Sequence, residues 1–93
     1  MPARSGQITV TTSGTAVQGT DVTGHMFAIA ADPANTETVW VGEDGSAGGD
    51  VTALNGFPLS PGAASIILML DNLNDLWFDA NVNGEKICWI QLD

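Results

Sequence analysis

Hydrophobic and polar residues alternate with a period of two along most of the chain. Ile8 and Val10 alternate with threonines, and Val39 and Val41 flank Trp40 farther on. Successive side chains of a strand point to opposite faces, so this alternation predicts strands with one face in a core. Helical spacing appears over no useful length. The expected extended segments are residues 8–12, 15–18, 25–31, 37–42, 56–59, 65–70, 76–80 and 86–92.

Turn residues separate these segments. Residues 32–36 contain Asp, Pro and Asn, which favour a turn, so we expect residues 25–31 and 37–42 to form a hairpin around them. Asn83 and Gly84 predict a second hairpin, between the last two segments, because both residues accept positive φ. Short strands separated by turns predict an all-β fold: a small antiparallel β-sandwich or jelly-roll-like barrel of about six to eight short strands.

The length of 93 residues suits one domain. We assign residues 1–7 to a flexible N-terminal arm and residues 8–93 to a single β-sandwich domain. The arm lacks the apolar core of a signal peptide, and the longest apolar run, residues 66–70, is too short to cross a bilayer. Residues 43–53 form a Gly-rich acidic loop, the part expected to be least ordered. These features predict a soluble protein made in a reducing cytosol.

The charge balance argues against two classes of partner. Eleven acidic residues face two basic ones, Arg4 and Lys86, for a net charge of −9. Binding of nucleic acid needs cations that neutralise phosphates, so it is not expected. An anionic membrane surface would repel the chain for the same reason. A positively charged protein partner remains compatible with the acidity.

Residues for catalysis or metal binding are sparse. His25, the one histidine, has no neighbouring nucleophile motif, and Cys88 sits in an apolar run typical of a buried structural thiol. One His and one Cys are too few for a zinc site. We therefore expect no enzyme, no cofactor and no internal disulfide.

Calcium is the one metal that the sequence brings into question. Residues 79–84 match the first half of an EF-hand loop, but its twelfth position is Ile90 instead of Glu. The acidic loop offers a second set of oxygens in Glu43, Asp44 and Asp50. Because the hairpin explains the first motif without a metal, no metal site is predicted.

Several segments are apolar on both faces and need two covers. If residues 66, 68 and 70 fill the core, then Ile67 and Met69 point outward. Trp40 and Trp77 point outward by the same rule. In the last segment either Ile87 and Trp89, or Cys88, Ile90 and Leu92, must leave the core face.

The second apolar face has two explanations. A loop or the N-terminal arm could cover it within one chain. We favour an interface between subunits, because Trp and Met are enriched in interface cores and an exposed apolar patch promotes aggregation. A homo-oligomer with closed rotational symmetry is the simplest arrangement. Its expected seam consists of Trp40, Ile67, Met69, Trp77 and Trp89.

The order and spacing of several motifs resemble those of small virion proteins of tailed bacteriophages, over nearly the whole chain. The resemblance implies a small β-sandwich or jelly-roll-like module on the outside of the head. Such modules are decoration or cement proteins, often trimers at local three-fold positions, or bases of head fibres. The motifs are Ile8-Thr9-Val10-Thr11-Thr12, Ala31-Asp32-Pro33-Ala34-Asn35-Thr36, Val39-Trp40-Val41-Gly42, Asn55-Gly56-Phe57-Pro58-Leu59, Pro61-Gly62, Asp71-Asn72-Leu73-Asn74 and Cys88-Trp89-Ile90.

We therefore expect a capsid decoration protein on the outer head surface of the virion, made in the cytoplasm of the bacterial host. It would bind the assembled major capsid protein as a homo-oligomer, a trimer, and stabilise the head by mass action. Arg4 and Gln7 are the expected capsid contacts. The alternative is a tail or adsorption module whose tryptophans stack on a host glycan. A monomeric calcium-binding, adhesin-like module comes third.

Overall fold

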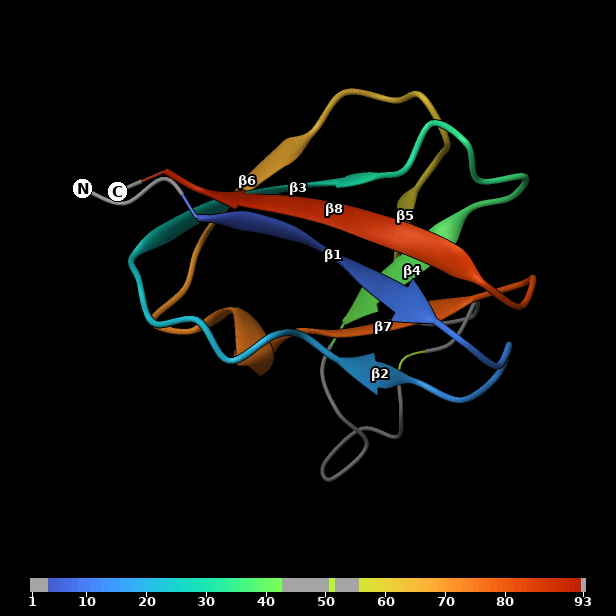
Figure 1. The fold of residues 1–93 in the computed structure, drawn as a ribbon, viewed down its shortest axis with the longest axis horizontal. Coiled ribbons are helices and arrows are strands. Elements are labelled where there is room, and N and C mark those ends of the chain that lie inside the picture. Colours follow the sequence, from blue (N-terminus) through green and yellow to red (C-terminus); the bar gives the residue numbers. More distant parts are fainter. Residues whose placement is uncertain (1–3, 43–50, 52–55, 93) are drawn as a thin grey trace.

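The protein is a sandwich of two antiparallel four-stranded sheets (Figure 1). The computed structural model describes residues 4–42, 51 and 56–92. The elements are β1 (Ser5–Val10), β2 (Val17–Gln18), β3 (Met26–Ala31), β4 (Val39–Gly42), β5 (Phe57–Leu59), β6 (Ile66–Met69), the 3₁₀ helix η1 (Leu73–Asp75), β7 (Trp77–Ala80) and β8 (Glu85–Gln91). In the described residues sheet A has the strand order β1-β8-β3-β6, and sheet B has the order β2-β7-β4-β5. The all-β prediction is confirmed.

The connections pass repeatedly from one sheet to the other. Among the described strands, only β4 and β5 follow each other in sequence and also pair in one sheet. Every other consecutive pair divides between sheets A and B. This alternation is the topology of an eight-stranded jelly roll, one of the two forms that the strand pattern predicts.

Both predicted hairpins are wrong, although the turns themselves form. β3 pairs with β6 and β8, and β4 pairs with β5 and β7. Both edges of β3 are thus occupied, and Val39 and Val41 of β4 reach the core from the opposite sheet. The buried carboxylate of Glu85 accepts the backbone N–H groups of Thr36 and Glu37 at 3.0 and 2.9 Å, which anchors the chain between β3 and β4 against β8.

The Asn-Gly turn likewise joins two sheets instead of two paired strands. Gly84 has a φ of +84°, but no described non-glycine residue has a positive φ, so Asn83 does not take the conformation that the predicted hairpin turn requires of both residues. The N–H of Gly84 donates to the carbonyl of Val10 at 2.8 Å, and Asn83 Oδ1 accepts the N–H of Ser13. These bonds place the start of β8 beside β1, so the chain leaves sheet B after β7 and enters sheet A.

Packing between the two sheets shows which residues of the last strand face the core. Ile87 and Trp89 of β8 point inward and are buried, whereas Cys88 and Ile90 point outward. The indole of Trp89 packs edge-on against Phe27, with ring centroids 6.5 Å apart. It also fills the space beside Gly6, where a Cβ atom would lie 3.1 Å from the ring. The remaining buried core includes Val10, Ile29, Val39, Leu73, Phe78 and Ile87.

The N-terminal arm is shorter than predicted. β1 begins at Ser5, because residues 5–7 pair with residues 88–90 of β8, so the boundary at residue 7 is wrong. Residues 1–3 lie outside the described residues, as does most of the predicted acidic loop. Within that loop, Val51 is described and buried.

Candidate interaction surface

The outer face of sheet A is an exposed apolar surface. Cross-strand neighbours build it in rows: Ile90, Ala28 and Ile67 share one row, and Met26 faces Met69 in the next. Ile67 is 62% exposed and Met69 80%, so no described residue covers this side of the strands. We call the surface the sheet A face; its members are Met26, Ala28, Ala30, Ile67, Met69, Cys88, Ile90 and Leu92.

The sheet A face is depleted of charge. Outward positions of β1, β3, β6 and β8 carry no carboxylate among the described residues, although the chain has 11 acidic residues. Lys86, near the start of β8, is the one charged side chain in those outward positions. Depletion of charge together with exposed Met and Ile side chains is typical of the core of a protein interface.

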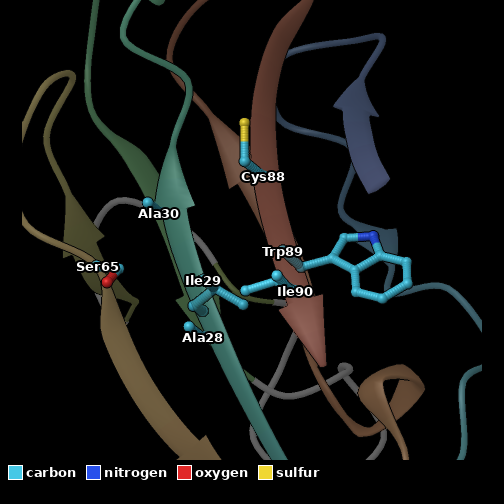
Figure 2. Close-up of a pocket in the computed structure, with 7 residues that line it drawn as sticks. All are labelled: Ala28, Ile29, Ala30, Ser65, Cys88, Trp89 and Ile90. Carbon is cyan, nitrogen blue, oxygen red and sulfur yellow. The ribbon is translucent and has the colours of Figure 1, made fainter. Parts of the chain in front are cut away.

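A shallow cavity of about 230 Å³ lies within the sheet A face. Ala28 and Ala30 contribute only methyl groups, and the larger Cys88 and Ile90 flank them from β8. In Figure 2, Ser65 lies on the other side of the two alanines from Cys88 and Ile90, and the Trp89 indole extends away from the other labelled side chains. Small residues between larger ones give this face a groove that could receive an apolar side chain from a partner.

The structure divides the five predicted seam residues among three places. Ile67 and Met69 lie on the sheet A face. Trp40 and Trp77 are half-buried on the outer side of sheet B, on neighbouring strands β4 and β7. Trp89 is 7% exposed in the core, so its assignment to a seam is wrong. The five residues therefore do not form one contiguous surface, because the two sheets present their outer sides in opposite directions.

The two predicted capsid contacts lie at one edge of sheet A. Arg4 Nε donates to Gln91 Oε1 at 3.0 Å, and its guanidinium reaches the carbonyl of Thr23. The amide of Gln7 donates to Asp32 Oδ2 at 3.4 Å and approaches the Cys88 sulfur at 3.5 Å. Gln7 is exposed and borders the sheet A face, whereas the Arg4 side chain is held by bonds within the chain.

A second cavity, of about 400 Å³, lies between the sheets and is lined by apolar residues. Ile66 and Leu68 of β6 line it from sheet A, and Phe57 of β5 lines it from sheet B. Phe57 is 55% exposed, so the cavity reaches the surface between these two edge strands. Its other lining residues are Val41, Gly42 and Leu76.

The described residues offer no clustered chemistry for catalysis or metal binding. No three His, Cys, Asp or Glu side chains among them gather closely enough to hold a metal ion. In the EF-hand-like segment, Asp79 Oδ1 accepts the N–H of Gly14 at 2.9 Å, and Asn81 Oδ1 accepts the indole N–H of Trp40. Glu43, Asp44 and Asp50 lie outside the described residues.

In the described part of the chain, no helix has the length and apolarity needed to cross a membrane. No family model, curated protein or solved structure matches this chain.

Proposed function

We propose that this chain is a structural binding protein of a tailed-bacteriophage head, which attaches to the outer surface of the assembled capsid as an oligomer. The sheet A face is the proposed attachment surface. The resemblance of the sequence motifs supplies the phage context, and the exposed apolar face supplies the means of binding. The trimer stays a prediction of the resemblance.

The observation that carries this proposal is a carboxylate-free apolar face on a chain with a net charge of −9. Exposed Ile67 and Met69 and the partly exposed Ile90 give the face apolar area that a partner can remove from water. The face has a groove over Ala28 and Ala30, so an apolar side chain of the capsid surface can insert into it. A protein that binds the assembled lattice through this face stabilises the lattice by mass action.

Cosedimentation with phage heads tests this proposal. Heads that lack this chain are prepared from the phage or prophage whose genome carries it, and purified chain is added in increasing amounts. We expect saturable binding to intact heads and none to the dissociated major capsid protein. A wild-type chain that never sediments with the heads would contradict the proposal.

Ile90→Glu should weaken binding to the heads at least about 100-fold, because docking would bury an unpaired charge. Ile90 is 39% exposed near the middle of the face, so the folded monomer tolerates the substitution. Thr20→Glu is the matched control, since Thr20 is an exposed residue outside sheet A and receives the same charge. Equal affinity of the two variants would exclude the sheet A face as the attachment surface.

The glycan-binding alternative would use the tryptophans of sheet B. Neither Trp40 nor Trp77 lines either of the two cavities described above. Trp40 donates its indole N–H to Asn81 at 3.2 Å, which occupies the polar atom that a sugar hydroxyl would use. A chain that binds a glycan array but no head, and loses glycan binding in Trp40→Ala, would establish this alternative.

A further inference from the structure

We propose that two copies of this chain pair antiparallel along β6, so that their A sheets join into one continuous sheet. A two-fold contact closes at two copies, so this proposal sets a dimer in place of the trimer that the resemblance implies, and it rests on the proposed function only for the head-bound state. The pairing itself is a property of the free protein. Three features of β6 carry it: its backbone, its composition and its self-complementary order.

The backbone of β6 has one free side. The N–H of Leu70 donates to the carbonyl of His25 at 3.1 Å, and the register continues with Leu68 opposite Phe27. In an antiparallel ladder alternate residues bond to the same neighbour, so the backbone groups of Ile67 and Met69 point away from β3. No described strand lies on that side, because β6 ends the order of sheet A. Such groups form a template for another strand.

The other sheet edges carry features that discourage pairing. The outward side chains of β1 are polar, β2 has two residues, and β5 contains Pro58. The sequence of β6 is Ile-Ile-Leu-Met, without a charge, a proline or a glycine. Charged residues, prolines and short length are the usual devices that protect an edge strand, and β6 is short but otherwise unprotected. It is therefore the described edge best suited to accept a strand.

The occupant is a second copy because β6 is complementary to itself. A two-fold axis at Leu68 places Ile67 opposite Met69 of the second copy. The backbone N–H and C=O groups of these two residues, which point away from β3, then form about four hydrogen bonds between the copies. On the inner side, Leu68 then faces Leu68 of the second copy, and Ile66 faces its Leu70. Every cross-strand pair in this register is apolar, and such pairs stabilise a sheet.

Two surroundings of β6 fit this arrangement. Ser65 and Asp71 flank the strand, and the same register brings Asp71 opposite Ser65 of the second copy, so no two carboxylates meet. On the inner side Ile66 and Leu68 line the apolar cavity that exposed Phe57 borders. The second strand adds apolar side chains beside this cavity, and the outer pairs extend the sheet A face across both copies.

The pairing is tested by the native mass of wild type and of the variant Ile67→Pro, measured by light scattering after size-exclusion chromatography. The N–H of Ile67 points away from β3, so proline removes no bond within the chain but blocks the added strand. We expect wild type to have twice the mass of one chain at micromolar concentration and Ile67→Pro to have the mass of one chain. Thr9→Pro is the matched control, because it makes the same change at a free-edge position of β1; it should remain a dimer.

A second variant guards against misfolding of Ile67→Pro. Met69→Glu alters an 80% exposed side chain, so the fold is retained, and it places carboxylates near the two-fold seam. We expect its dimer to dissociate at least about 10-fold more readily. A wild-type monomer would overturn the pairing, and so would a wild-type trimer, because a two-fold contact along β6 cannot close a ring of three copies. Ile90→Glu distinguishes the two proposals, because this variant should remain a dimer but bind the phage heads much more weakly.

Discussion

Trp89→Ala should lower the free energy of unfolding by about 3–5 kcal/mol, the usual cost of removing a large aromatic ring from a core. The indole contacts Phe27 edge-on and fills the space beside Gly6, so the substitution leaves a cavity between β8 and β1. Domains of this size are stable by roughly 5–15 kcal/mol, so much of the stability is lost. Urea denaturation followed by far-ultraviolet circular dichroism measures the change.

Two companion variants show whether Trp89 acts in the core. Trp77→Ala removes a half-buried ring from the outer side of sheet B and should cost clearly less. Trp89→Phe keeps a ring and removes the indole N–H, which has no hydrogen-bond partner among the described residues, so it too should cost less than alanine. A Trp89→Ala variant with unchanged stability but weakened self-association would return this residue to the seam and contradict the fold.

Gly19→Ala should cost about 3 kcal/mol, the second largest effect, because the chain has no room for a Cβ atom there. A Cβ at this position would collide with the backbone carbonyl of Leu73, at the start of η1. A carbonyl in a helix cannot move aside like the end of a flexible side chain, so the backbone must shift, which is the costly form of overpacking. The Gly19 N–H also donates to Leu76 at 2.9 Å, so the shift strains this bond.

The free energies of unfolding of Gly19→Ala and Gly62→Ala, both measured by urea denaturation, distinguish a steric collision from backbone strain. Gly62 has a φ of +76° in a turn, and nothing lies within 4 Å of a Cβ added there. Alanine at Gly62 should therefore cost about 1 kcal/mol, from the left-handed conformation alone. Equal losses in the two variants would show that the connection after β2 does not press against η1 as described.

The period of two in the sequence predicted the strands and most of their faces. Val39 and Val41 are buried while Trp40 is half-buried, and Ile67 and Met69 are exposed as expected. These predictions hold because alternation follows from strand geometry alone, whichever strands are neighbours. The outward apolar side chains of the individual segments could be anticipated for the same reason.

The partners of each strand could not be predicted from the sequence. The Asn83-Gly84 turn reverses the chain locally, but the bond from Gly84 to Val10 decides that β8 joins sheet A. The Glu85 carboxylate accepts the N–H groups of Thr36 and Glu37, which lie about 50 positions away in the sequence. No local sequence pattern predicts such a contact. In β8 both faces are apolar, so the period of two could not choose between Trp89 and Cys88 for the core.

Division of the seam residues between two faces also required the topology. Outward positions on different strands share a surface only if those strands belong to one sheet. Trp40 and Trp77 belong to sheet B, and Ile67 and Met69 belong to sheet A. The depletion of carboxylates could have been noticed in the outward positions of the individual segments, but their assembly into one face appears only with the strand order.

Oxidative footprinting of the chain on phage heads tests the central claim most directly. Methionine and tryptophan mark opposite sides of the molecule, with Met69 on the sheet A face and Trp40 and Trp77 on the outer side of sheet B. The free protein, in the same oligomeric state, is the reference. We predict slower oxidation of Met69 on the heads and unchanged oxidation of both tryptophans. Protection of the tryptophans with Met69 still reactive would contradict attachment through the sheet A face.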